Sequence, residues 1–375
     1  MKNKLNQFFL DYSFTQNDID AFFDSLDKSF EKGFQINSEL INNLYLILDK
    51  LTLKSSTLFK LDLCRKYCLY YLGQSGKCDF SSFEKLKDGD LVDYDSIYTE
   101  GLSKHNAKCA IIKLNGGLGT SMGCTGPKSL VEVMPNKTFL DFIFDQQAVL
   151  KGRGIDLPFY VMNSPQTDQL TKDVFPNLNS FLQHRIPRID TVSKQPVSLS
   201  HKEQEGCPPG HGDIYLSLLE SGICDELLNQ GVEYVFVSNS DNLGASFEPK
   251  ILAYMVQHNH DFIMETTAKR KTDVKGRTLT RTKDGLSLLE VAQVHDKNLD
   301  AFCDIERFTV FNTNNIWFNL RSMKLTQILK VMKRELLHLL EQLLLILVNS
   351  LGVQHKINTL LKKQVLKKTF GGKTK

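Results

Sequence analysis

The sequence KLNGGLGTSMGCTGPKS occupies residues 113–129 and continues directly from an apolar run, CAIIKL, that begins at Cys109. Its glycines at positions 116, 117 and 119 permit a tight turn and a close approach of backbone N–H groups to an anion. Thr120 and Ser121 add hydroxyl groups to the loop, and Lys128 adds a cation. We therefore predict a phosphate-binding loop at the end of a β-strand.

The loop does not fit two common phosphate-binding motifs. No GK[ST] follows Gly119 at the spacing of a Walker A loop, and the acidic residue that should accompany GxGxxG after a second strand is absent. Neither label therefore applies.

Further apolar runs followed by turn or helical segments recur after the loop: PFYVMNS, EYVFVSNS, DFIMETT and FTVFNTNNIWF. Strands that alternate with helices predict an α/β fold with a Rossmann-like, doubly wound mixed sheet, mainly parallel. Ligands of such sheets bind where the carboxyl ends of the strands open into loops. The functional residues should therefore lie just after these runs.

The run VFVSNSDNLGA ends in Asn239, Ser240 and Asp241. A buried strand with this ending brings a carboxylate to the ligand edge of the sheet, where oxygen ligands suit a magnesium ion bound to phosphates. We predict that Asp241 is a Mg²⁺ ligand. The alternative is an Asp in an ordinary turn at the end of a strand.

The combination of LNGGLGT, GPKS and a preceding strand resembles the nucleotide loop of sugar nucleotidyltransferases, in wording closest to UTP–glucose-1-phosphate uridylyltransferases. Other sugar nucleotidyltransferases often have an Arg after the GT pair, where this sequence has Ser121. The resemblance runs in order from about residue 91 through residue 320. It implies these nucleotide-binding residues in the loop: Leu114, Asn115, Gly116, Gly117 and Lys128.

Two other segments are similar to the same family. QHRIPRI resembles the segment in which a Gln faces the uracil ring, which implies this role for Gln183, since an amide both donates and accepts hydrogen bonds. CPPGHGDIY implies that Gly210 lies against the base and that His211 reaches the sugar phosphate. Without the resemblance, Gln183 would be an ordinary loop residue and His211 a residue at a helix start, with Asp213 favourable at the helix N-terminus.

Later segments complete the substrate site that the resemblance implies. LLEVAQV and FNTNNIWF contain carboxylate and amide groups that pair well with sugar hydroxyls. The implied substrate-binding residues are His211, Asn239, Ser240, Asp241, Glu290, Asn312 and Asn314, and Asn315 belongs to the same cluster. Asn-rich turns are also common without any ligand.

The resemblance implies a uridylyltransferase that forms UDP-glucose and pyrophosphate from UTP and glucose 1-phosphate, with Mg²⁺ as cofactor. Lys128 and Asp241 are the implied catalytic residues. Such a reaction needs positioning and charge neutralisation rather than a covalent nucleophile. Two alternatives stay open: a catalytically inactive protein that binds UTP or another protein, and an enzyme for another acceptor such as an N-acetylhexosamine 1-phosphate.

Bulk composition gives little support to other classes. The 46 basic and 43 acidic residues nearly cancel, which offers no case for a nucleic-acid or membrane-surface partner. The eight cysteines form no CxxC pair, and Cys207 with His211 lacks the further ligands of a zinc site. We interpret the cysteines as reduced thiols, and Cys64 and Cys68 as core residues on one helix face. The expected location is the cytoplasm.

The sequence predicts three parts: N-terminal helices over residues 1–95, a nucleotidyltransferase domain over 96–322, and a Leu- and Lys-rich tail over 323–375. The family normally continues with a second catalytic Lys in a segment like KTTSDLL and a C-terminal β-helix, and neither pattern is visible here. The tail is helical in period but apolar on several faces. A partner helix or homo-oligomer seam is one interpretation, and an altered reading frame after about Leu325 is another. Loss of a cation near the phosphates would reduce the rate by about a thousandfold.

Overall fold

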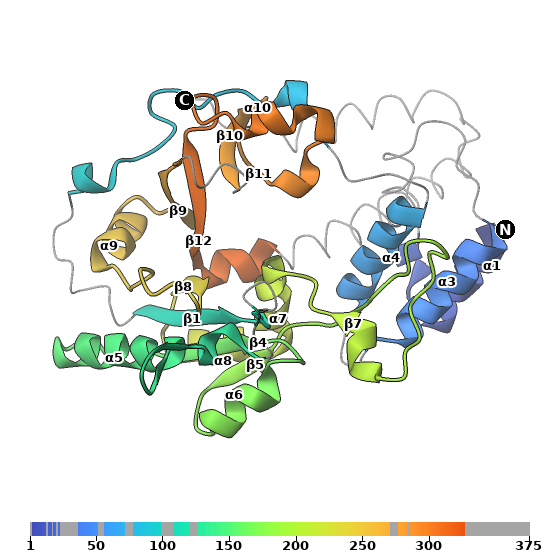
Figure 1. Cartoon of the computed structure of the whole chain (residues 1–375), viewed down its shortest axis with the longest axis horizontal. Helices are drawn as coiled ribbons and strands as arrows, with labels where there is room; N and C mark the ends of the chain where they lie inside the picture. The colour runs from blue at the N-terminus through green and yellow to red at the C-terminus, as the bar shows by residue number, and fades with distance from the viewer. Residues whose placement is uncertain are drawn as a thin grey trace, which may run out of the picture.

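The computed structural model describes residues 2–12, 14–16, 18, 19, 22, 37–51, 56–71, 78–98, 108–119, 123, 126–270, 277–283 and 285–326. Figure 1 shows a central sheet with its helices, a bundle of N-terminal helices at the right and a smaller lobe at the top. Thr120 and Ser121 of the predicted loop, and the tail beyond residue 326, lie outside the described residues. The interpretations of that tail therefore stay predictions.

The central sheet has six strands, with the order β5-β4-β1-β8-β12-β9. They are β1 (Cys109–Asn115), β4 (Phe159–Asn163), β5 (Ser180–Leu182), β8 (Tyr234–Asn239), β9 (Phe262–Ala268) and β12 (Val310–Asn319). The pairs β4–β5, β1–β4 and β1–β8 are parallel, whereas β12 is antiparallel to β8 and β9. The predicted mixed, doubly wound sheet is confirmed. The short strand β5 is not among the predicted runs.

The chain crosses from β1 to β4 and β5 on one side, then returns to the other side of β1 as β8. In the β1–β8 pair, Leu114 lies opposite Asn239. The loops that follow these two strands therefore leave the sheet at neighbouring points and turn in opposite directions. This is the topological switch point at which doubly wound sheets bind their ligands.

Side chains of β1 alternate between two cores, as the two-residue period of a strand requires. Ala110 and Ile112 pack in the core that α7 and α8 cover, while Cys109 and Ile111 pack in the core of α9. All seven residues of β1 are buried, which explains why five of them are apolar; Lys113 and Asn115 are the two exceptions. The helices around the sheet are α5 (Phe139–Gly152), α6 (Asp168–Val174), α7 (Ile214–Glu220), α8 (Ile223–Asn229) and α9 (Pro249–Gln257).

Three N-terminal helices share a core of their own. They are α1 (Lys2–Asp11), α3 (Ser38–Asp49) and α4 (Thr57–Tyr71). Cys64 and Cys68 lie on one face of α4 and are fully buried, so their predicted role as core residues is confirmed. The bundle contacts the loop between β6 (Ile186–Pro187) and β7 (Gly206–Cys207): Lys50 Nζ lies 2.6 Å from the Glu205 carboxylate.

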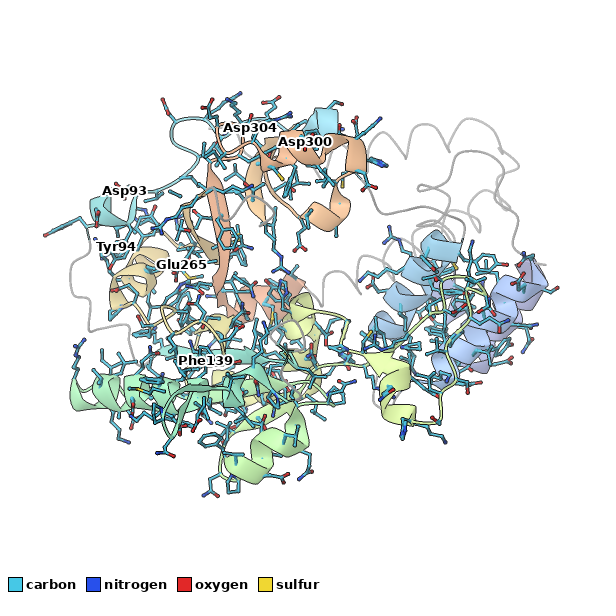
Figure 2. All side chains as sticks on the ribbon, viewed as in Figure 1. Asp93, Tyr94, Phe139, Glu265, Asp300 and Asp304 are labelled. Atoms are coloured by element: carbon cyan, nitrogen blue, oxygen red, sulfur yellow. The ribbon has the colours of Figure 1, made fainter. Side chains whose placement is uncertain are left out.

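The upper lobe combines residues 78–90 with β10 (Thr278–Thr282), β11 (Gly285–Leu289) and α10 (Leu299–Cys303), whereas Tyr94 lies beside α9. Phe80 and Phe83 pack there with Phe302 and Phe308, and Glu84 N donates to Arg281 O at 2.8 Å. Asp300 and Asp304 belong to this lobe, whereas Phe139 begins α5 beneath the sheet (Figure 2). The predicted boundary near residue 95 is not decided by this packing, and the three-part division stays a prediction.

The remaining short elements lie in the connections. They are β2 (Glu132–Met134), β3 (Lys137–Thr138) and the 3₁₀ turns η1 (Phe80–Ser82), η2 (Tyr94–Ser96), η5 (Lys128–Leu130), η6 (Lys202–Glu205), η7 (His211–Asp213), η8 (Val291–Gln293) and η9 (Asp296–Asn298). Over the described part of the chain, no helix has the length and apolar character needed to cross a membrane.

Candidate functional site

The glycine loop leaves β1 at Asn115 and turns back to a short 3₁₀ segment that begins at Lys128. Lys128 N donates to Gly117 O at 3.1 Å, which closes the loop, and Gly119 has a left-handed backbone with φ of 59°. Residues with a side chain rarely adopt this conformation. The backbone conformation of the loop therefore favours glycine at position 119. The Lys128 N–H fixes the point at which the chain returns to the start of the loop.

The loop and the tip of β8 lie together at the carboxyl edge of the sheet. Ser240 N donates to Leu114 O at 3.0 Å, which extends the β1–β8 pairing by one residue. One residue further, the Asp241 carboxylate lies 3.0 Å from Lys128 Nζ. Both side chains remain about 30% exposed, at 28% and 31%. The acidic strand tip and the cation of the loop thus lie side by side, partly exposed, at the carboxyl edge of the sheet.

Gln183 follows the edge strand β5, and its side chain packs on the loop. Its backbone N donates to Asn163 O at 2.8 Å, and the residue is only 5% exposed. A methyl group at Gly116 would overlap the Gln183 amide nitrogen. Gly116 is therefore the position at which the loop makes room for this amide, and the structure brings together two residues predicted to bind the nucleotide.

The next residue, His184, connects this region to the N-terminal bundle. Its ring stacks on Phe59 of α4 at 4.0 Å, and its nitrogens lie 2.9 Å from Asp213 and 2.8 Å from Glu220. Burial by itself lowers the pKa of His184, but hydrogen bonds to both carboxylates outweigh it and raise the pKa to about 9. His184 is therefore a cation at neutral pH. Asp213 stands at the N-cap position of α7, as expected without the resemblance, but its carboxylate binds this ring and accepts from Ser217 Oγ instead of from a backbone N–H of the helix.

Gly210 and His211 lie at the entry to α7, as the sequence predicted. Gly210 has φ of 112°, a conformation that favours glycine, and its carbonyl accepts from Asp213 N at 3.2 Å. His211 Nε2 lies 3.1 Å from Arg277 Nη1, and Arg277 Nε lies 2.9 Å from the Glu290 carboxylate. Two residues predicted to bind substrate, His211 and Glu290, are therefore joined by an arginine that the sequence analysis did not identify.

The amides of the Asn cluster satisfy one another. Asn314, with a left-handed φ of 61°, donates from Nδ2 to Asn239 Oδ1 at 2.8 Å and from its backbone N to Asn312 Oδ1 at 2.8 Å. The main-chain N of Asn312 donates to Arg277 O at 3.0 Å. This chain of contacts links the end of β8 to the His211–Arg277–Glu290 group, so that both parts of the predicted substrate site belong to one region.

Three of the predicted residues have buried side chains that are already engaged. Leu114 packs in the core beneath the sheet. Asn115 donates from Nδ2 to Asn163 Oδ1 at 2.8 Å and accepts from Ser240 Oγ at 3.3 Å. Leu114 and Asn115 therefore have only backbone groups to offer a nucleotide. The Ser240 hydroxyl is used in a hydrogen bond between the end of β8 and β1 rather than for a ligand.

The region has a second cation that the sequence analysis missed. Lys113 of β1 is only 1% exposed, and its Nζ donates to Ser238 Oγ and Ala245 O, both at 2.7 Å. Burial lowers the pKa of Lys113 to about 8, although Glu265 raises it in part. Glu265, labelled in Figure 2, also accepts from Trp317 Nε1 at 2.7 Å. A charged residue inside an otherwise apolar strand was the signal that could have identified Lys113.

The described residues contain no group of three or more His, Cys, Asp or Glu side chains that could hold a metal ion. A site with one carboxylate, Asp241, suits a magnesium ion that takes its other ligands from substrate phosphates and water. The Asp241 carboxylate therefore fits a metal that arrives with the nucleotide.

Known proteins of similar sequence point to the same family as the sequence motifs. The family model for UTP–glucose-1-phosphate uridylyltransferase matches residues 62–343. The chain is 42% identical over 270 residues to UTP–glucose-1-phosphate uridylyltransferase of Musa acuminata, covering 68% of this chain and 58% of that one. It is 43% identical over 240 residues to the protein of the same name in Encephalitozoon cuniculi, covering 62% and 49%.

Solved structures give the same result. A UDP-glucose phosphorylase of Trypanosoma brucei superimposes with a TM-score of 0.72 at 33% identity, over 77% of this chain and 65% of that one. A mutant UDP-glucose pyrophosphorylase of Leishmania major, solved in complex with UDP-glucose, gives 0.69 at 31% identity, over 78% and 65%. The chain spans about half to three-fifths of the length of the curated relatives that it matches. On these matches, the chain belongs to the UTP–glucose-1-phosphate uridylyltransferase family.

Proposed function

We propose that this chain binds UTP and glucose 1-phosphate and forms UDP-glucose and pyrophosphate. The observation that carries the proposal is the pair of Lys128 and Asp241, 3.0 Å apart at the carboxyl ends of β1 and β8. A cation beside a carboxylate that can hold Mg²⁺ suits a triphosphate, because its negative charges need both a fixed cation and a metal. The glycine loop adds backbone N–H groups at the same edge of the sheet.

Gln183 is the proposed reader of the base. Its amide, held against Gly116, can donate to one carbonyl of a uracil ring and accept from the ring N–H. A cytosine presents a lone pair where uracil presents that N–H. The amide therefore provides a chemical basis for preferring a uridine nucleotide, with Gly210 completing the base site.

The reaction needs no covalent nucleophile. A phosphate oxygen of glucose 1-phosphate attacks the α-phosphorus of UTP in line, the bond to the β-phosphate oxygen breaks, and pyrophosphate leaves. Lys128 would stabilise the negative charge of the phosphates and keep them aligned with the attacking oxygen. When bound at Asp241, Mg²⁺ would neutralise charge on the phosphate oxygens.

His211, Glu290 and the Asn312–Asn314 pair are the proposed sugar-phosphate residues. Their support is that they converge from three segments on one side of the β8 tip. His211 and Glu290 both bond to Arg277, and Asn314 bonds to Asn312, so a sugar phosphate must compete with these contacts.

The test is pyrophosphate release from UTP and glucose 1-phosphate in the presence of Mg²⁺, with UTP binding measured in parallel by calorimetry. Turnover supports the proposal. UTP binding without turnover would favour the alternative, an inactive nucleotide-binding protein of the same family. Replacing glucose 1-phosphate with N-acetylglucosamine 1-phosphate in the assay tests the sugar preference. The same assay measures the turnover rate, which we expect to be reduced because the tail lacks the family's second catalytic Lys.

We place this activity in the cytoplasm. The support is that the seven cysteines in the described part of the chain form no disulfide. A homo-oligomer formed through the Leu-rich tail stays a prediction, which light scattering of the full chain would test.

A further inference from the structure

Arg277 lies at the centre of a three-residue group drawn from distant parts of the chain. Its backbone carbonyl accepts from Asn312 N at 3.0 Å, which fixes it beside β12. Its side chain then bridges His211 Nε2, at 3.1 Å, and Glu290 Oε1, at 2.9 Å. The Arg277 and Glu290 side chains are 34% and 33% exposed, so the group can be reached from solvent.

The chemistry of the guanidinium group decides the proton position on His211. A guanidinium has five N–H donors and no acceptor, so it can only donate to a ring nitrogen. His211 Nε2 must therefore carry a lone pair, which places the single ring proton of the neutral imidazole on Nδ1. Nδ1–H is then the hydrogen-bonding group that His211 has left to offer.

The surroundings of His211 also favour the neutral form of its ring. Burial lowers the pKa of His211, the positive charge of Arg277 lowers it further, and the carboxylate of Glu290 raises it in part. Protonation of Nε2 would also replace a hydrogen bond with two N–H groups that face each other. His211 therefore stays neutral at physiological pH.

We propose that Arg277 is a positioning residue of the sugar-phosphate site: it holds His211 in the Nδ1–H tautomer and orients the Glu290 carboxylate beside it. His211 then presents one N–H donor to a phosphate or sugar oxygen and contributes no positive charge of its own. The charge is supplied by the guanidinium behind it, which keeps three further N–H groups. The identity of the ligand rests on the proposed function, but the tautomer does not.

The decisive experiment is ¹⁵N NMR of the histidine rings in the full chain, with the His211 signals assigned from a His211→Gln variant. We expect a protonated Nδ1 and an unprotonated Nε2 in the wild type. In Arg277→Met, which removes donor and charge at similar length, the two tautomers should mix and the titration midpoint of His211 should rise by about one pH unit. Arg277→Lys should keep the low midpoint, because it keeps the charge.

Arg153→Met is the matched control, because Arg153 is exposed at the end of α5 and its loss removes the same charge elsewhere. It should leave the His211 signals unchanged. A wild-type ring protonated on Nε2 would overturn the proposal. So would an Arg277→Met variant whose tautomer and midpoint match the wild type.

Ligand binding separates this proposal from the proposed function. Glucose 1-phosphate should shift the His211 Nδ1 signal of the wild type, and in Arg277→Met its Kd should rise about tenfold, with partial recovery in Arg277→Lys. Shifts of equal size and affinity in all three proteins would overturn the positioning role, whether or not the chain turns over. A bound ligand and a fixed tautomer in a chain without turnover would refute only the proposed function.

Discussion

Lys128 Nζ lies 3.0 Å from the Asp241 carboxylate, although 113 positions separate the two residues in the chain. One follows the glycine loop after β1, and the other follows the tip of β8. Parallel pairing of these strands brings both to the same edge of the sheet. Three of the four predictions below start from contacts of this kind, between residues that are distant in sequence and adjacent in the fold. The fourth concerns two buried thiols on one helix.

Asp241→Asn should abolish turnover with little effect on folding. The variant keeps the size of the side chain but removes the negative charge that faces Lys128 and that would hold Mg²⁺. Loss of such a group costs a hundredfold or more in kcat, on the order of 3 kcal/mol. Pyrophosphate release and thermal melting measure the two effects. Asp156→Asn, which breaks an exposed pair with Lys151, is the control. Near-wild-type rates in Asp241→Asn would refute the assignment of Asp241.

Gly116→Ala should weaken UTP binding by displacing Gln183. The added methyl group would occupy the position of the Gln183 amide nitrogen, which must then leave the loop. We expect about a tenfold rise in the Kd for UTP, and a similar rise in Gln183→Ala, measured by calorimetry.

The double variant tests the mechanism of that effect. Because both changes remove the same contact, the double variant should be little worse than either single one. Gly152→Ala, at the end of α5 where a methyl group meets no atom within 4 Å, is the control. Additive losses would show that Gly116 and Gln183 act independently.

His184 should make stability fall as the pH rises from about 6.5 to about 9. Its pKa is raised in the folded state, so the folded protein binds the proton more tightly than the unfolded chain does. The stabilisation is fully present below pH 6.5 and is lost as the pH passes through about 9. The full shift corresponds to about 3 kcal/mol, and screening by solvent reduces the expected contribution to roughly 2 kcal/mol.

Urea denaturation at pH 6 and pH 9.5 measures this contribution. His184→Gln should be less stable than the wild type at pH 6 and should lose less stability between the two pH values. His258→Gln, an exposed position, is the control. Equal pH dependence in wild type and His184→Gln would contradict the role of the Asp213 and Glu220 partners.

The thiols of the α4 cysteines should resist alkylation in the folded protein. Burial raises the pKa of Cys64 well above its usual value and that of Cys68 to about 12, and both residues are fully buried. Iodoacetamide followed by peptide mass spectrometry should label half-exposed Cys78 and Cys303 many times faster. Rapid labelling of Cys64 would contradict its assignment to the core.

Much of the fold could be predicted because its signals are local. The runs that became β1, β4, β8, β9 and β12 are apolar enough to stand out from the helices and turns between them. Edge strand β5 was missed because three residues, only one of them buried, carry no pattern. The antiparallel direction of β12 was also not assigned, since direction depends on the connection and not on the strand itself.

The sequence by itself determined the phosphate loop and the acidic strand tip, because glycine conformations and strand endings depend on neighbouring residues alone. It did not reveal that the Asn115 side chain is hydrogen-bonded to Asn163 and Ser240. Nor did it reveal that Arg277 joins His211 to Glu290. Those contacts join segments many residues apart, and they form only after the strands have paired and the β10–β11 hairpin has packed beside β12. Local chemistry therefore fixed which groups are available, and tertiary packing decided which of them face one another.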